Sequence, residues 1–322
     1  MTFTEIKKAI NGTTKEPHSI QVYLVLKTDG HLTMRLADIE NKTLPELQTM
    51  FESFVADSII AKDDLQIRNL SSADEAPNAI YEYDYDSFPE ELGLFKNFKI
   101  SEAVSIEKFD FSKDDLSTLF GYIIYVGTME NGFLLFKKHY PISLIKRDSF
   151  LLGARKSSQR FEKLPGDDII RLNGSIQLLR INETIYIFDI HVLERNLGFS
   201  ELITQAAIES VDAISILGVI ENIDVLNEMT EDPSFARKLS KVKKSSPIFK
   251  LGIKKETIVE FSKTNPGLAG KFKYSEDGSA IRLDTKKSKD LFVKLMNDAF
   301  LRSELTQQYY EAISKDNVSN QT

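Results

Sequence analysis

Lysine side chains gather in the last third of this 322-residue chain, and their spacing suggests chemistry with a negatively charged partner. Between Arg237 and Lys294 the sequence has 16 basic and 6 acidic residues, although the whole chain carries a net charge of −7. Lysine meets phosphate as a point charge, whereas bidentate reading of guanine edges is typical of arginine. The composition therefore favours contacts to a polyanion backbone with little sequence preference. A solvated lysine-rich surface is the competing interpretation.

The helices expected around these lysines place several of them at helix starts. Asp232-Pro233 has the form of an N-cap followed by proline at the first helical position, and Ser245-Ser246-Pro247 ends that helix. Further helices are expected over 254–263 and 286–301, separated by a β-hairpin over 271–284. Lysine in a first helical turn opposes the helix dipole, so two helices that begin with lysine suggest an anion as the partner.

The first two thirds of the chain predict an antiparallel sheet. Short apolar segments broken by Gly, Asn, Pro or Asp fill residues 120–190. Asn173-Gly174 is expected to turn a hairpin, because a type I′ turn needs positive φ at both central positions. Asn182-Glu183 is expected to make the next reversal of the chain. Further strands are expected at 19–27, 31–37, 65–70, 79–85 and 103–109, and helices at 4–10 and, capped by Thr43, up to Ile60.

The expected fold class is α+β. A mainly antiparallel β domain over 1–190 is followed by a helical, lysine-rich domain with a small β-hairpin over 191–322. Within the first domain, the stretch from Asp74 to Glu91 holds seven carboxylates and no lysine or arginine. The two domains are therefore expected to present surfaces of opposite charge.

Several classes of protein are disfavoured by the composition. The chain has no cysteine and four histidines, which excludes thiolate catalysis and argues against a histidine-based metal site. There is no P-loop and no dinucleotide-binding glycine motif. We expect no catalytic residue, no metal and no cofactor. No apolar run reaches the ~18 residues of a membrane span and the N-terminus lacks a signal-peptide core, so a cytoplasmic protein is expected.

Two segments resemble a known family. Residues 161–195 follow the pattern of a sheet that leads into helices, and residues 289–312 contain a closing motif. The motif residues are Leu295, Met296, Asn297, Asp298, Leu301, Ser303, Leu305, Thr306 and Tyr309 or Tyr310. Over residues 120–312 the chain resembles the KwaB family, the cytoplasmic component of the Kiwa anti-phage system. Ser303 is expected to turn the chain after the Leu301 helix, with Tyr309 and Tyr310 packing back.

The resemblance implies a DNA-binding protein that interferes with phage DNA replication or transcription. It further implies a homodimer that works beside a small multi-span membrane partner of the KwaA type, which would recruit it to the inner face of the cell membrane. It supplies no catalytic residue. The residues expected to contact DNA are Arg237, Lys238, Lys241, Lys243, Lys244, Lys250, Lys254, Lys255, Lys271, Lys286, Lys287 and Lys289.

Two alternatives belong to other functional classes. A metal-dependent DNA nuclease needs carboxylates and a lysine near a strand end, to hold Mg²⁺ and activate water. The candidate sets are Asp277, Asp284 and Lys286, or Glu162, Lys163, Asp167 and Asp168. The second alternative is an interaction scaffold whose lysines meet an acidic protein or an anionic membrane surface.

Overall fold

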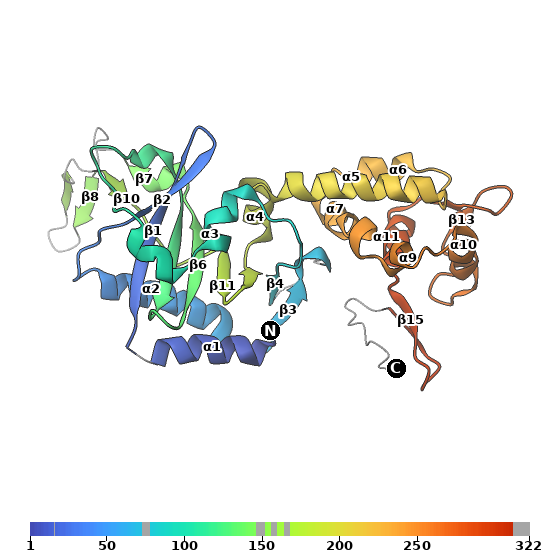
Figure 1. The fold of residues 1–322 in the computed structure, drawn as a ribbon, viewed down its shortest axis with the longest axis horizontal. Coiled ribbons are helices and arrows are strands. Elements are labelled where there is room, and N and C mark those ends of the chain that lie inside the picture. The colour runs from blue at the N-terminus through green and yellow to red at the C-terminus, as the bar shows by residue number, and fades with distance from the viewer. Residues whose placement is uncertain (16, 73–77, 146–151, 156–159, 164–167, 312–322) are drawn as a thin grey trace. The chain divides into compact units, whose positions relative to one another are not determined.

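The computed structural model describes residues 1–15, 17–72, 78–145, 152–155, 160–163 and 168–311, with side chains left out for 72, 152–155 and 160–163 (Figure 1). The chain divides into two compact units. Unit 1 comprises Met1–Gln66 and Glu91–Val192, and unit 2 comprises Ile67–Glu90 and Leu193–Thr322. Residues 67–90, expected in the first domain, thus belong to unit 2 together with the C-terminal helices.

The elements up to the end of unit 1 are mostly strands, with helices near the N-terminus. The strands are β1 (Ser19–Thr28), β2 (His31–Leu36), β3 (Gln66–Asn69), β4 (Ala79–Glu82), β5 (Leu119–Gly127), β6 (Gly132–Lys138), β7 (Leu144–Ile145), β8 (Leu152–Arg155), β9 (Arg160–Lys163), β10 (Ile169–Ile170), β11 (Leu178–Ile181) and β12 (Thr184–Ile187). The helices are α1 (Phe3–Lys15), α2 (Leu44–Val55), a π-helical turn (Ala56–Ile60) and α3 (Gly93–Asn97). Short 3-10 turns lie at 70–72, 90–92, 100–105, 116–118 and 141–143.

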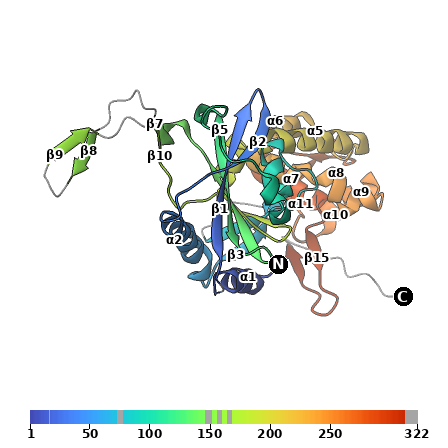
Figure 2. The ribbon, with the colours of Figure 1, turned by 60° about the vertical axis from the view of Figure 1, so that its left-hand side comes forward.

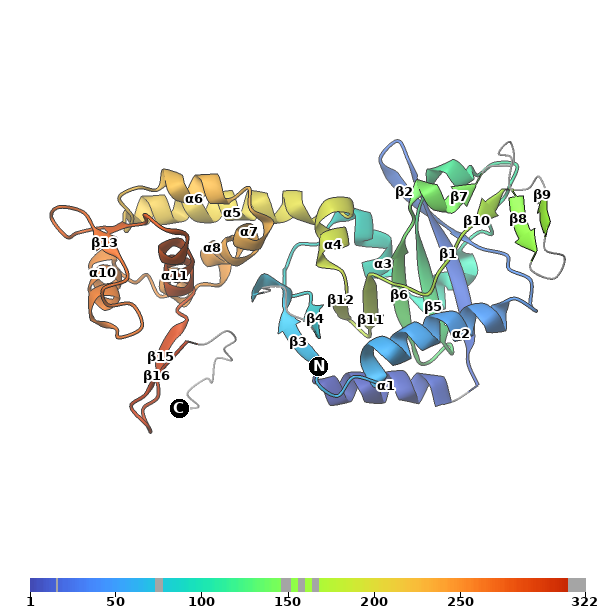
Figure 3. The ribbon, with the colours of Figure 1, turned by 180° about the vertical axis from the view of Figure 1, so that it is seen from behind.

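Within unit 1, neighbouring strands run antiparallel in the order β2-β1-β5-β6-β11-β12. Helices α1 and α2 lie on the face seen in Figure 3, and α3 lies on the opposite face, seen in Figure 1. On the α3 face, Phe95 contacts Phe136 at 5.7 Å and Phe98 contacts Tyr23 at 5.0 Å between ring centroids. Because β5 is buried along its whole length, both faces of the sheet are covered, and the alternating side chains form two apolar layers.

Arg180 on β11 ties α3 to the sheet. Its guanidinium donates to the carbonyls of Phe95, Lys96 and Phe98 at 2.5–2.7 Å. The carbonyls at a helix C-terminus have no partner within the helix, and the five donors of an arginine can satisfy several of them together. The partly buried charge of Arg180 is thereby satisfied by backbone carbonyls, with an added electrostatic contribution from Glu183.

Lys138 on β6 is a second partly buried cation. It is expected to make the free energy of unfolding of unit 1 change with pH in the alkaline range. Its Nζ donates to the carbonyls of Phe120 and His139 at 2.9 and 3.1 Å. Burial, and then the positive charge of Lys27, lowers the pKa of Lys138 to about 8. Unfolding therefore takes up a proton between pH 8 and the ordinary lysine range, so stability rises with pH there. We expect a gain of roughly 1–2 kcal/mol, after allowance for solvent screening.

This dependence can be isolated by substitution. Urea unfolding of the Lys138→Met variant, followed by circular dichroism at several pH values, should show greater stability than the wild type at pH 7 and a flatter profile above pH 8. A wild-type profile that is flat across this window, or a variant profile that rises as steeply as the wild type's, would remove the buried ammonium as the cause.

Unit 2 is built mainly from helices. They are α4 (Ile190–Asn196), which begins in unit 1, and α5 (Phe199–Leu217), α6 (Asp224–Met229), α7 (Pro233–Ser240), α8 (Val242–Ser245), α9 (Pro247–Lys250), α10 (Lys255–Thr264) and α11 (Lys286–Met296). Two short hairpins complete the unit: β13 (Lys273–Tyr274) with β14 (Ile281–Arg282), and β15 (Phe300–Arg302) with β16 (Tyr309–Glu311). The α+β class is confirmed.

The core of unit 2 follows from the apolar stripes of its helices. On α5, Ile203, Ala207, Val211 and Ile214 are buried, at the three- and four-residue spacing of one helical face. The helix ends before Gly218, whose φ of 67° favours glycine, because a Cβ strains the left-handed backbone conformation. The predicted N-cap Asp232 is confirmed, since its carboxylate accepts from the amide of Ser234 at 2.9 Å and begins α7.

Several sequence-based expectations were wrong. Asn173-Gly174 does not turn a hairpin, because β10 pairs with β7 and β11 pairs with β6 and β12. Glycine at 174 instead allows close approach, since a Cβ there would meet the carbonyl oxygen of Met50 at 2.7 Å. The expected turn at Asn182 is confirmed, with a φ of 53° between β11 and β12.

Two further differences concern element type. Residues 100–105 form a 3-10 turn and not a strand. The last helix ends at Met296, because Asp298 takes a φ of 53° and the chain continues as β15. The closing motif therefore turns the β15–β16 hairpin, in which Tyr309 and Tyr310 are exposed by 45% and 52% and do not pack back.

Candidate nucleic-acid interface

The lysines of α8, α9 and the start of α10 lie on short helices that are fixed to unit 2 by a few buried side chains. Ser246 caps α9, because its Oγ accepts from the amide of Ile248 at 3.1 Å and donates to the carbonyl of Met296 on α11. Val242 and Ile248 are buried beside it. Helices α8, α9 and α10 are neighbours in Figure 2. Apart from Leu251, the apolar side chains from Val242 to Ile253 are buried or partly buried, which leaves the lysines of this stretch toward the surface.

Arg237 is not part of this surface. It is 2% exposed, and its guanidinium donates to the carboxylate of Glu194, which is itself 7% exposed. The Tyr85 hydroxyl donates to the Arg237 carbonyl at 2.9 Å. A guanidinium keeps its charge even when buried, so loss of Glu194 alone would leave an uncompensated charge inside unit 2, and Arg237 cannot reach a ligand outside.

Lys241 and Lys238 are also engaged within unit 2. The Lys241 ammonium pairs with Asp84, whose carboxylate accepts in addition from the Ser71 amide at 3.0 Å and hydroxyl at 2.5 Å. The same ammonium lies 5.2 Å from the centre of the Tyr85 ring. Lys238 pairs with Asp290 on α11 at 3.2 Å. Both side chains are partly buried, so we assign them to the packing of α7.

The remaining lysines before α11 are available to solvent. Lys244, Lys250, Lys254 and Lys271 are exposed, and Lys255 is half-buried. In the described part of the chain, no acidic partner is found for Lys244, Lys250, Lys254 or Lys255. Lys243 contacts Glu209 at 3.1 Å, but both side chains are more than 40% exposed, so this pair is weak. Lys243, Lys244, Lys250, Lys254 and Lys255 are named the α8–α10 lysines below.

A second group, the α11 lysines, comprises Lys286, Lys287 and Lys289 in the first turns of α11. Thr285 and Ser288 form a reciprocal capping box, with amide-to-hydroxyl distances of 3.0 and 3.1 Å. Lys286 and Lys287 are exposed and Lys289 is half-buried. Among the described residues, the structure thus separates buried or firmly paired side chains at α7 from exposed or half-buried lysines on α8–α10 and α11, of which Lys243 has a weak surface partner.

The carboxylates considered for a nuclease are committed to local bonds. Asp277 accepts from the Ser275 hydroxyl at 2.6 Å and the Ser279 amide at 3.0 Å, and these bonds lower its pKa. Asp284 pairs with Lys273 at 2.8 Å and Arg282 at 3.0 Å, and hydrogen bonds from these two side chains hold the pKa of Asp284 below its usual value. Asp167, and the side chains of Glu162 and Lys163, lie outside the described residues.

Within the residues that are described, no group of three His, Asp or Glu side chains is arranged to hold a metal ion. No helix among them combines the length and apolar character needed to cross a membrane.

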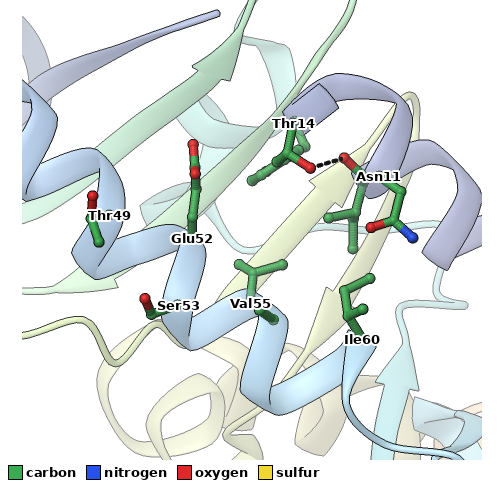
Figure 4. Close-up of a pocket in the computed structure, with 10 residues that line it drawn as sticks. Asn11, Thr14, Thr49, Glu52, Ser53, Val55 and Ile60 are labelled. Carbon is green, nitrogen blue, oxygen red and sulfur yellow. Dashed lines mark hydrogen bonds between the residues drawn. The ribbon is translucent and has the colours of Figure 1, made fainter. Parts of the chain in front are cut away.

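Unit 1 contains a cavity of about 270 Å³ between α1, α2 and β6 (Figure 4). Apolar side chains such as Ile10, Val55 and Ile60 line much of it. Two of its polar groups are already bonded: the Thr14 hydroxyl donates to the Ile10 carbonyl at 3.1 Å, and Glu52 contacts His18 at 2.5 Å. None of the predicted DNA-contacting residues lines this cavity.

Sequence reasoning missed the acidic partners Glu194 and Asp84. The contact between Asp84 and Lys241 joins residues 157 positions apart, and that between Glu194 and Arg237 joins residues 43 apart. Neither has a local spacing signal. The indication in the sequence was the acidic tract around Asp84, which lies at a distance in the chain from the basic stretch and is opposite to it in charge.

Comparisons with known proteins agree on one family. A family model described as Kiwa protein KwaB-like matches residues 116–306. Kiwa protein KwaB of Escherichia coli O55:H7 (strain RM12579 / EPEC) is 27% identical over 323 residues, which cover 99% of this chain and 99% of that protein. No solved structure matches the chain.

Proposed function

The chain belongs to the Kiwa protein KwaB-like family, and on this basis we propose that it is an anti-phage defence protein that binds DNA through the α8–α10 lysines. The proposal depends above all on one observation. Four of these ammonium groups are unpaired in the described structure, and no acidic residue occurs between Pro233 and Lys255. Such a group of free cations gains most from a ligand with closely spaced phosphates, because binding releases the counterions condensed on DNA.

The chemistry of these side chains defines the kind of binding. Lysine contacts to phosphate fix the protein on the duplex without reading base edges, so sequence preference should be small. The α11 lysines would add further phosphate contacts. We propose that occupation of phage DNA in this way obstructs its replication or transcription.

The biological setting proposed for the protein follows the family. We propose a cytoplasmic homodimer that works beside a small multi-span membrane partner of the KwaA type and is recruited by it to the inner face of the membrane. Support for this setting comes from family membership alone. The interaction scaffold remains the competing function, since free lysines also fit an acidic protein surface. A nuclease gains no support from Asp277 or Asp284, whose carboxylates are engaged by neighbouring groups.

Two single lysine substitutions separate DNA contacts from internal pairing. Lys254→Gln removes an exposed, unpaired charge, so it should weaken DNA binding a few-fold and reduce the slope of log affinity against log salt by about 0.9. Lys241→Gln removes a charge held by Asp84, so it should leave that slope unchanged and instead lower the stability of unit 2. Fluorescence anisotropy across a salt series, with urea unfolding of each variant, measures both.

The opposite pattern, in which Lys241→Gln lowers the salt slope and Lys254→Gln does not, would show that the Asp84 pair opens for DNA. The division of the lysines proposed above would then be wrong.

A further inference from the structure

The turn between α9 and α10 combines lysines with an exposed leucine. Leu251 is 74% exposed and lies directly after Lys250 and three residues before Lys254. A large apolar side chain in this position gains nothing from solvent, and a phosphate backbone offers it no partner. Binding to the DNA backbone would therefore account for the lysines of this turn but not for the exposed Leu251 beside them.

The turn holds Leu251 outward in a fixed geometry. The amide of Gly252 donates to the Phe249 carbonyl at 3.1 Å, and the amide of Ile253 donates to the Ile248 carbonyl at 2.9 Å. Gly252 takes a φ of 61°, and a Cβ built on it would meet nothing within 4 Å, so the tip of the turn borders open space. Ile248 is buried and fixes the base of the turn. Leu251 thus lies exposed on a turn whose backbone is hydrogen-bonded on its C-terminal side and whose base is buried.

We infer that this turn binds directly to an anionic lipid surface, with Leu251 entering the headgroup region and the α8–α10 lysines meeting lipid phosphates. Lysines near a negatively charged leaflet are each attracted to it, and an apolar side chain buried at the headgroup boundary adds to that attraction. The charge complementarity is strong, because the eight charged residues from Pro233 to Lys255 are all basic.

This inference goes beyond recruitment by a membrane partner, because the contact lies between lipid and this chain's own residues. It does not depend on DNA binding, although the two ligands would use the same lysines. Leu251 distinguishes them: burial of its side chain contributes to binding of a bilayer and contributes nothing to contacts with phosphates along a duplex.

Vesicle flotation of the purified full-length protein tests the inference. Vesicles of phosphatidylcholine, with and without phosphatidylglycerol, are compared for the wild type, Leu251→Asn and Leu305→Asn. Leu305 is the matched control, because it is 92% exposed in unit 2 but lies next to Glu304 in the segment that joins β15 to β16. Both substitutions alter exposed side chains, so neither should impair folding.

We expect binding to vesicles that contain phosphatidylglycerol, little binding to phosphatidylcholine alone, a roughly tenfold loss of affinity for Leu251→Asn and no loss for Leu305→Asn. DNA affinity of Leu251→Asn should equal that of the wild type. Equal binding to both kinds of vesicle, or full vesicle binding by Leu251→Asn, would overturn the inference. A loss of DNA affinity in Leu251→Asn would also overturn it, by showing that Leu251 serves DNA, and absence of DNA binding by the wild type would refute only the proposed function.

Discussion

Reversal of three charges, Lys250→Glu, Lys254→Glu and Lys255→Glu together, should lower the affinity for duplex DNA by roughly 100-fold at moderate salt. Each replacement removes a phosphate contact and adds a repulsive carboxylate, and three lost contacts should reduce the slope of log affinity against log salt by about 3. None of these lysines has an acidic partner in the described structure, so their reversal breaks no internal ion pair. Fluorescence anisotropy with a labelled duplex measures both quantities.

A matched control separates local contacts from net charge. Lys42, Lys99 and Lys113 of unit 1 are exposed by 67–80%, and their reversal changes the net charge by the same amount. This variant should keep most of the DNA affinity and nearly the wild-type slope. Equal losses in the two triple variants would mean that overall charge, and not the α8–α10 lysines, determines binding.

Glu194→Ala should destabilise unit 2 by about 3–5 kcal/mol. The substitution leaves the Arg237 guanidinium buried, charged and without its carboxylate partner, and such a group is costly because it cannot be neutralised. The midpoint of urea unfolding, followed by far-ultraviolet circular dichroism, should fall accordingly. DNA binding should be lost at the denaturant concentrations where unit 2 unfolds.

Two companion variants test the cause. Replacing both partners, Glu194→Met with Arg237→Met, should recover much of the lost stability, because no unpaired charge remains buried. Glu102→Ala removes the carboxylate of an ion pair with Lys99 in which both side chains are more than 60% exposed, and it should have little effect. A Glu194→Ala variant as stable as Glu102→Ala would contradict the structural role of the buried pair.

Local patterns in the sequence predicted most elements of the fold. The N-cap Asp232, the helix from Leu44 and the strands on either side of Asn182 depend on neighbouring residues, and all of them are present in the structure. The α+β class follows from the same patterns. The prediction of a hairpin at Asn173-Gly174 was wrong, because glycine at 174 allows close contact with the backbone of Met50 and does not form a hairpin turn. Met50 is more than a hundred residues away in the chain, so no local pattern indicates this contact.

The candidate interface was less predictable, because pairing between distant residues decides which cations are free. The sequence grouped Arg237 and Lys241 with Lys250 and Lys254, since all four lie in one basic stretch. The fold then buries Arg237 against Glu194 and holds Lys241 on Asp84. Arg237 lies two residues after the buried Phe235, so helical periodicity does not predict that Arg237 is buried too. No local pattern in the sequence identifies Glu194 as the carboxylate buried with it.

The most direct test of DNA binding by this chain is the affinity of the wild-type protein for two labelled duplexes of unrelated sequence across a salt series, with Mg²⁺ present and the DNA recovered on a gel. We expect equal affinities for the two duplexes, a linear fall of log affinity against log salt with a slope of about −4 from the α8–α10 lysines and steeper with contacts from the α11 lysines, and intact DNA. Absence of binding at low salt, affinity independent of salt, or cleaved DNA would each contradict a lysine-mediated, backbone-directed DNA-binding protein.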